Sequence, residues 1–121
     1  MIVDTARTAA ELLAPHLEGR EGPAIAVLHL DSERLLLDTS AGDHSGDDLP
    51  VRDIVAAALR IGSDSVIVGL GRPAGDSAPS DQERAAARRL ADAAAAVGVR
   101  LTDHFIFAGG ECTSFRALGL L

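Results

Sequence analysis

The sequence contains no lysine, tryptophan or tyrosine, and its aromatic residues are limited to Phe105, Phe107 and Phe115. All eleven basic residues are therefore arginines, and eighteen acidic residues outnumber them to give a formal net charge of −7. Nucleic-acid binding draws much of its affinity from basic side chains that displace counterions from phosphates. Because the charge opposes such binding and few rings could stack on bases, we do not expect a nucleic-acid partner.

Cysteine and long apolar runs are also scarce. Cys112 is the only cysteine, which excludes an internal disulfide and a cluster of thiolate metal ligands. We expect it to be a small buried apolar residue. No apolar run approaches the roughly 20 residues that a membrane span requires. The N-terminus lacks the basic and apolar regions of a signal peptide, so the sequence predicts a cytoplasmic protein without a membrane partner.

Apolar residues make up 47% of the 121 residues, which is typical of one globular domain with a single core. Because aromatic residues are few, Leu, Val, Ile and Ala must fill that core. No linker, repeat or low-complexity tract divides the chain. We therefore expect one domain over residues 1–121.

Periodicity and capping signals predict three helices and four or five strands. The helices are expected to start at Asp4 or Thr5 and end near Leu13, where Pro15 ends or kinks the first one, and to cover residues 51–61 and 80–97. The strands are expected over residues 24–30, 34–38, 64–70, 99–101 with 104–108 and, as an edge, 112–115. This order predicts an α/β fold, in which a mixed sheet has helices on its faces.

Two segments between these elements are expected to be loops. Residues 39–50 form the longest polar stretch, and we interpret them as a mobile surface loop, with a lid or binding loop as the alternative. Residues 71–79 are rich in glycine and proline. The second of these segments lies within the most informative motif of the sequence.

That motif lies in residues 70–83, which read Leu-Gly-Arg-Pro-Ala-Gly-Asp-Ser-Ala-Pro-Ser-Asp-Gln-Glu. The stretch resembles the RadC form of the JAMM motif, His-x-His-Pro-Ser-Gly-Asp followed by Pro-Ser-x-x-Asp. Four further segments resemble the same family in the same order, namely residues 27–31, 51–59, 101–106 and 114–120. The resemblance covers roughly residues 5–121, so the chain is similar to the JAB/MPN domains of the RadC family.

The resemblance implies a three-layer fold, a mixed sheet flanked by helices as in cytidine deaminases. It also implies zinc-assisted hydrolysis of peptide or isopeptide bonds. In such a site two His and one Asp hold the zinc, a Ser steadies the oxyanion, and an upstream Glu is the general base. Zinc would then be the expected cofactor.

This sequence departs from that pattern at the metal ligands. The two His positions are Leu70 and Arg72, and the Asp position is Glu83. An alkyl group cannot ligate zinc, and a permanent guanidinium cation repels it. The base position falls on Pro23, and Glu21 two residues away cannot be assumed to replace it. A catalytic zinc needs about three protein ligands, so we expect no metal and no cofactor.

The retained residues have a structural interpretation beside the functional one. Ser80 keeps the family's side chain, and Ser80 with Glu83 matches a capping box at a helix start. We expect Arg72 and Glu83 to form an ion pair across the former metal pocket. His104 is expected to be packed and hydrogen-bonded near it. If a ligand or partner pocket survives, its residues would be these four together with Asp76.

Three functions remain open at this point. The first is a metal-free JAB/MPN pseudo-enzyme that binds a protein partner or associates with itself. The second is a divergent hydrolase of the JAMM type that uses another metal arrangement or none. The third is association with DNA repair, which only the historical label of the family suggests and which the net charge of −7 opposes.

Overall fold

The computed structural model describes residues 1–45 and 48–121. Within these residues the helices are α1 (Ala6–Leu17), α2 (Val51–Ile61) and α3 (Asp81–Ala96). The strands are β1 (Ala24–Leu30), β2 (Leu36–Asp43), β3 (Ser65–Arg72), β4 (Arg100–Ala108) and β5 (Glu111–Ser114). No helix in the described ranges is long and apolar enough to cross a membrane.

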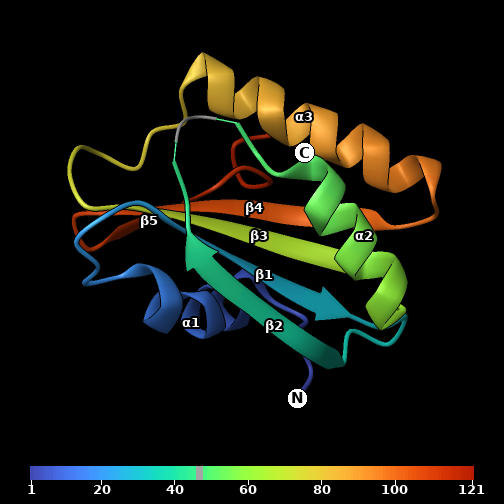
Figure 1. Ribbon diagram of the computed structural model, residues 1–121. Coiled ribbons are helices and arrows are strands. Elements are labelled where there is room, and N and C mark those ends of the chain that lie inside the picture. The colour runs from blue at the N-terminus through green and yellow to red at the C-terminus, as the bar shows by residue number, and fades with distance from the viewer. Residues whose placement is uncertain (46–47) are drawn as a thin grey trace.

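The strands form one mixed sheet in the order β2-β1-β3-β4-β5. β3 and β4 run parallel, whereas the other neighbouring pairs run antiparallel. Helix α1 covers one face of the sheet, and α2 and α3 cover the other (Figure 1). The expected three-layer α/β architecture, with a mixed sheet between helices, is confirmed.

The helix ends follow the signals in the sequence. The Thr5 side chain caps α1 by accepting from the Thr8 N–H, and Ser80 caps α3 in the same way through Glu83. Gly62 ends α2 in the left-handed conformation at φ 82°, which a residue without Cβ adopts at little cost. These caps fix where each helix meets the sheet.

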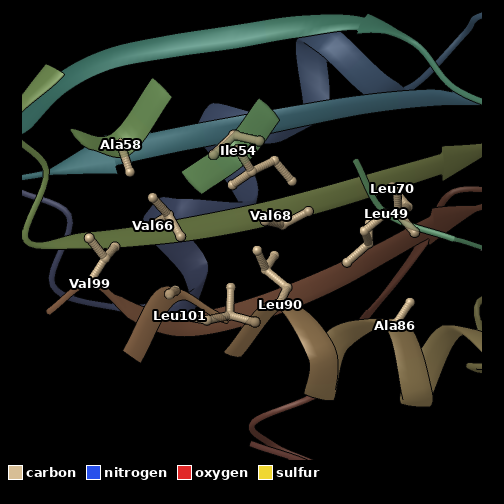
Figure 2. Close-up of a cluster of buried hydrophobic side chains, with 12 residues drawn as sticks. Leu49, Ile54, Ala58, Val66, Val68, Leu70, Ala86, Leu90, Val99 and Leu101 are labelled. Atoms are coloured by element: carbon tan, nitrogen blue, oxygen red, sulfur yellow. The ribbon is translucent and has the colours of Figure 1, made fainter. Parts of the chain in front are cut away.

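The core has two main parts because β3 is buried on both faces. On one face, side chains from β3 and β4 pack against α2 and α3, and Figure 2 labels Leu49, Ile54, Ala58, Val66, Val68, Leu70, Ala86, Leu90, Val99 and Leu101 of this cluster. On the other face, Phe105 and Phe107 join side chains of β1 and α1. Aliphatic side chains thus fill most of the core, as the composition predicts.

Helix α1 extends beyond its expected end near Leu13. It continues through Pro15 to Leu17, so the expected stop was wrong. Proline removes one helical hydrogen bond, but Leu13 and Leu17 are both buried, and the Glu18 N–H still donates to the Ala14 carbonyl at 2.9 Å. Burial of the apolar stripe outweighs the missing bond.

Strand β2 lies later in the chain than expected. It covers Leu36–Asp43, so residues 39–43 are strand and the prediction of a loop over residues 39–50 was wrong for them. Gly46 and Asp47 of that segment lie outside the described residues. Gly71 and Arg72, also expected in a loop, end β3 and pair with β4. In both cases backbone pairing with a neighbouring strand overrides polar or glycine-rich composition.

Cys112 is exposed, which contradicts the expectation of a buried residue. It lies on β5, the strand at one edge of the sheet, opposite Phe107. Phe107 is buried under α1, but an edge strand has sheet on one side only. Burial of the residue beside it therefore does not extend to Cys112.

Helix α1 approaches β3 too closely for side chains at two positions. A Cβ added at Gly71 would lie 2.6 Å from the backbone oxygen of Leu17, and one at Gly69 would lie 2.6 Å from the Leu17 Cδ1 atom. Both distances are shorter than a van der Waals contact. The end of the Leu17 side chain can move to make room for a Cβ at position 69. The Leu17 backbone can move only together with α1, so glycine is required more strictly at position 71.

We therefore predict that Gly71→Ala destabilises the fold by about 2–3 kcal/mol through overpacking, and that Gly69→Ala costs less. Gly42→Ala is the matched control, since its Cβ would meet nothing within 4 Å. Chemical denaturation of the three variants tests this order. Equal stability of Gly71→Ala and Gly42→Ala would contradict the close approach of α1.

Candidate functional site

The residues that resemble the JAMM motif lie where β3 ends and α3 begins. Leu70, at the first former His position, is 5% exposed and belongs to the core cluster with Leu49 and Ala86 (Figure 2). Its side chain is therefore part of the packing between the sheet and the helices. This position contributes apolar contact and no ligand atom.

Arg72 and Glu83 form the expected ion pair. The Nη1 atom donates to Oε2 at 3.2 Å and the Nη2 atom donates to Oε1 at 3.1 Å, so the pair is bidentate. Nη2 also donates to the Ala78 carbonyl at 2.8 Å. The Arg72 and Glu83 side chains are 27% and 6% exposed. The prediction that the guanidinium would face the carboxylate across the former pocket is confirmed.

Ser80 and Glu83 form the expected capping box. The Glu83 N–H donates to the Ser80 Oγ at 3.0 Å, and the Ser80 N–H donates to the Glu83 Oε1 at 2.9 Å. Oε1 therefore accepts from Ser80 and from Arg72 at once. The carboxylate that aligns with a zinc ligand already holds the helix start and a guanidinium.

The remaining positions of the motif line the same end of the sheet. Ala24 pairs with Gly71, so Pro23 is next in register to Arg72, where the alignment places the general base. Proline has no side-chain base. Asp76 lies in the loop before α3 and its carboxylate accepts from the Ala78 N–H at 3.0 Å. The loop thus uses Asp76 to fix its own turn.

His104 lies on β4 opposite Val68 and is fully buried. Its ring stacks on Phe115 with centroids 4.3 Å apart. Neither ring nitrogen forms a hydrogen bond with a described residue, so the side chain is packed as expected but the expected hydrogen bond is missing. Burial lowers the pKa of His104 to about 4, and the ring is neutral at pH 7.

Arg72 also lines a cavity of about 340 Å³ together with Arg20 and the end of α1. Asp76, Ser80, Glu83 and His104 do not line this cavity, although hydrogen bonds join Arg72, Ser80 and Glu83. A larger cavity of about 600 Å³ lies at the opposite end of the sheet, where the lining includes Thr5, Asp31 and Arg100. None of the five residues lines that cavity either.

Sequence reasoning gave no role to His29, which the structure places in a polar pair. Its ring is 0% exposed, and Nδ1 lies 2.9 Å from the Ser63 Oγ. The Nε2 atom has no partner among the described residues. The signal in the sequence was a histidine within an otherwise apolar strand. The pattern alone does not tell a histidine with a polar partner from one that is only packed in the core.

The residues present at the former metal position do not fit a zinc ion. Leu70 supplies no donor atom, the Arg72 guanidinium carries positive charge to that position, and the Glu83 carboxylate already accepts three hydrogen bonds. Across residues 1–45 and 48–121 there is no group of three or more His, Cys, Asp and Glu that could hold a metal.

The match to known families covers almost the whole chain. A family model described as "RadC-like JAB domain" matches residues 3–120. The chain belongs to this family.

Relatives of this RadC-like JAB chain include UPF0758 proteins from several bacteria. One from Xanthomonas axonopodis pv. citri (strain 306) is 35% identical over 108 residues, which is 87% of this chain and 48% of that protein. One from Neisseria meningitidis serogroup C is 36% identical over 94% of this chain and 52% of that protein. One from Symbiobacterium thermophilum is 30% identical over 95% and 50%. The chain spans about half the length of the curated relatives it matches.

The ion pair at the former metal position should be energetically coupled. In a double-mutant cycle with Arg72→Met and Glu83→Gln, we expect a coupling free energy of about 1–2 kcal/mol, because both groups are largely buried and bidentate. The exposed pair Arg7–Glu11 on α1 is the control and should couple by about 0.5 kcal/mol or less. Equal coupling in both cycles would mean that the Arg72 pair is no stronger than a surface contact.

His104 should make the fold less stable in acid. Its pKa is about 4 when folded, below the value of roughly 6.5 for an unfolded histidine, so the unfolded chain binds the proton more readily. The free energy of unfolding should therefore fall as the pH drops from about 6.5 to about 4, by on the order of 3 kcal/mol.

His104→Phe should remove this part of the pH dependence while keeping a ring against Phe115. Burial lowers the pKa of His29 too, and its contribution stays in both proteins. Urea denaturation at several pH values between 7 and 4 gives the comparison. Parallel pH profiles for the two proteins would show that His104 is not buried as a neutral ring.

Proposed function

We propose that this RadC-like JAB domain is a metal-free pseudo-enzyme that acts by binding a protein partner. The observation that carries the proposal is the bidentate pair between Arg72 and Glu83. It places a permanent positive charge where the family places zinc, and it occupies the one carboxylate that remains of the ligand set. No cofactor is required for such a function.

The alternative, a divergent hydrolase, finds little support at this site. Zinc-assisted hydrolysis needs a metal that lowers the pKa of a bound water and a base that accepts its proton. Pro23 offers no base, and Leu70 is packed in the core. Association with nucleic acid is opposed by the net charge of −7. A binding role requires none of the missing groups.

Metal analysis tests the proposal directly. We expect the purified protein to contain no stoichiometric zinc when measured by inductively coupled plasma mass spectrometry. We expect a triple variant, Leu70→His with Arg72→His and Glu83→Asp, to bind zinc with measurable affinity, because the backbone of the fold still presents the ligand positions. It should nevertheless hydrolyse no peptide or isopeptide bond, since Pro23 cannot accept a proton.

Leu70→His alone is the matched control and should bind zinc much more weakly than the triple variant, because Arg72 remains. About one zinc per chain in the unmodified protein would overturn the proposal. Peptidase activity of the triple variant would identify another base, with Glu21 as the first residue to substitute.

A further inference from the structure

A groove of about 300 Å³ runs between β1, β2 and α2, away from the former metal position. Its floor is formed by Ile25, Val27 and His29 of β1, and its far wall by side chains of α2 including Ile54. On β2 the groove-facing residues are Ser40 and Gly42, which lie opposite Val27 and Ile25. Because these two side chains are small, the groove is open toward the edge of the sheet.

β2 is an edge strand of the sheet, and its outer backbone groups face away from β1. The Thr39 N–H donates to the Asp38 carboxylate at 2.8 Å. Since backbone groups alternate between the two sides of a strand, the N–H groups of Ala41 and Asp43 point outward with that of Thr39. This row of donors and acceptors is a template for another strand.

The chain itself already uses the beginning of this edge. The Val3 N–H donates to the Arg34 carbonyl and the Leu36 N–H donates to the Met1 carbonyl, both at 2.8 Å. Ile2 pairs antiparallel with Leu35. An extended segment therefore fits beside this hairpin, and the edge beyond Leu36 continues in the same line.

The floor of the groove carries an unsatisfied polar atom. His29 is 0% exposed, its Nδ1 atom is 2.9 Å from the Ser63 Oγ, and its Nε2 atom has no partner within the described part of the chain. An unpaired buried nitrogen is costly, so the floor of the groove is polar at this point.

We propose that the groove binds an extended basic segment of a partner protein, which adds to β2 as a further strand and inserts alternate side chains beside α2. Backbone pairing would supply affinity and the groove would supply specificity, the general pattern of strand addition. This names the surface and partner class for the proposed binding function and rests on it.

The acidic residues at the groove favour a basic partner segment over a second copy of this chain. Asp53 is the one carboxylate in the groove lining, and within the described residues it forms no ion pair. Asp38 adds a second exposed carboxylate on the edge strand, while Arg60 acts on His29 from the end of α2. A second copy carries the same net charge of −7, and pairing β2 with it would bring Asp38 of both chains to one interface, where like charges repel; Asp43 is already paired with Arg20.

A direct test uses a fluorescein-labelled peptide of sequence Val-Lys-Val-Thr-Val-Lys-Val and fluorescence anisotropy. Two analogues accompany it, one with glutamate in place of lysine and one N-methylated at alternate backbone nitrogens. We expect saturable binding of the parent peptide and affinity at least about tenfold weaker for each analogue. No binding of the parent peptide at millimolar concentration would overturn the proposal.

The protein variants locate the site. Gly42→Leu should fill the groove and weaken binding about tenfold or more, because a Cβ there meets nothing within 4 Å; circular dichroism checks that the variant is folded. Gly22→Leu, at a position equally free of neighbours and outside the groove, is the matched control and should bind normally. Asp53→Asn should weaken binding of the lysine peptide and reduce its salt dependence. Equal affinity of Gly42→Leu and the unmodified protein would exclude the groove.

Ala41→Pro separates backbone pairing from groove contacts. It removes one outward N–H and should weaken binding without loss of a bond to β1, because proline is tolerated at sheet edges. Sedimentation velocity on the same variants tests self-association, and a dimer that Gly42→Leu dissociates would assign the groove to a second copy and overturn the proposal. Zinc analysis tests the metal-free proposal independently of the peptide. A zinc-free protein that binds no peptide would therefore contradict the groove as the binding site and leave the metal-free proposal standing.

Discussion

The close contact between α1 and β3 is the constraint on which the rest of this fold depends. Gly69 and Gly71 leave no room for side chains on the α1 face of the strand, because Leu13 and Leu17 occupy it. Side chains of a strand alternate between faces, so Leu70 and Arg72 must point toward α3.

In this chain the alternation places an apolar side chain and a cation on the α3 face of β3. Leu70 joins the core between the sheet and the helices, and Arg72 reaches the first turn of α3. Apolar packing and a bidentate ion pair thus connect β3 to α3. At the other side of the sheet, β2 is an edge strand.

The sequence predicted the parts of the fold that local chemistry determines. Ser80 and Glu83 predict the start of α3, and Gly62 predicts the end of α2. The continuous apolar run of β3 predicts that this strand is buried. The resemblance placed Arg72 opposite Glu83, and their hydrogen bonds agree. These features depend on residues close in sequence or on a motif with fixed spacing.

The predictions that were wrong concern features that depend on residues distant in the sequence. Residues 39–43 are polar, and only pairing with β1 makes them a strand. Pro15 stays within α1 because Leu17 is buried beyond it, and Cys112 is exposed because β5 has no outer neighbour. The pairing of His29 with Ser63 joins residues 34 positions apart. No pattern within a short window contains this information.

The ion pair between Arg72 and Glu83 is a connection that the chain supplies by itself. A zinc ion is supplied from outside and lost to chelators or to competing metals, whereas a guanidinium is covalently part of the chain and stays charged throughout the physiological pH range. The junction of β3 and α3 therefore assembles as the chain folds, without waiting for an ion.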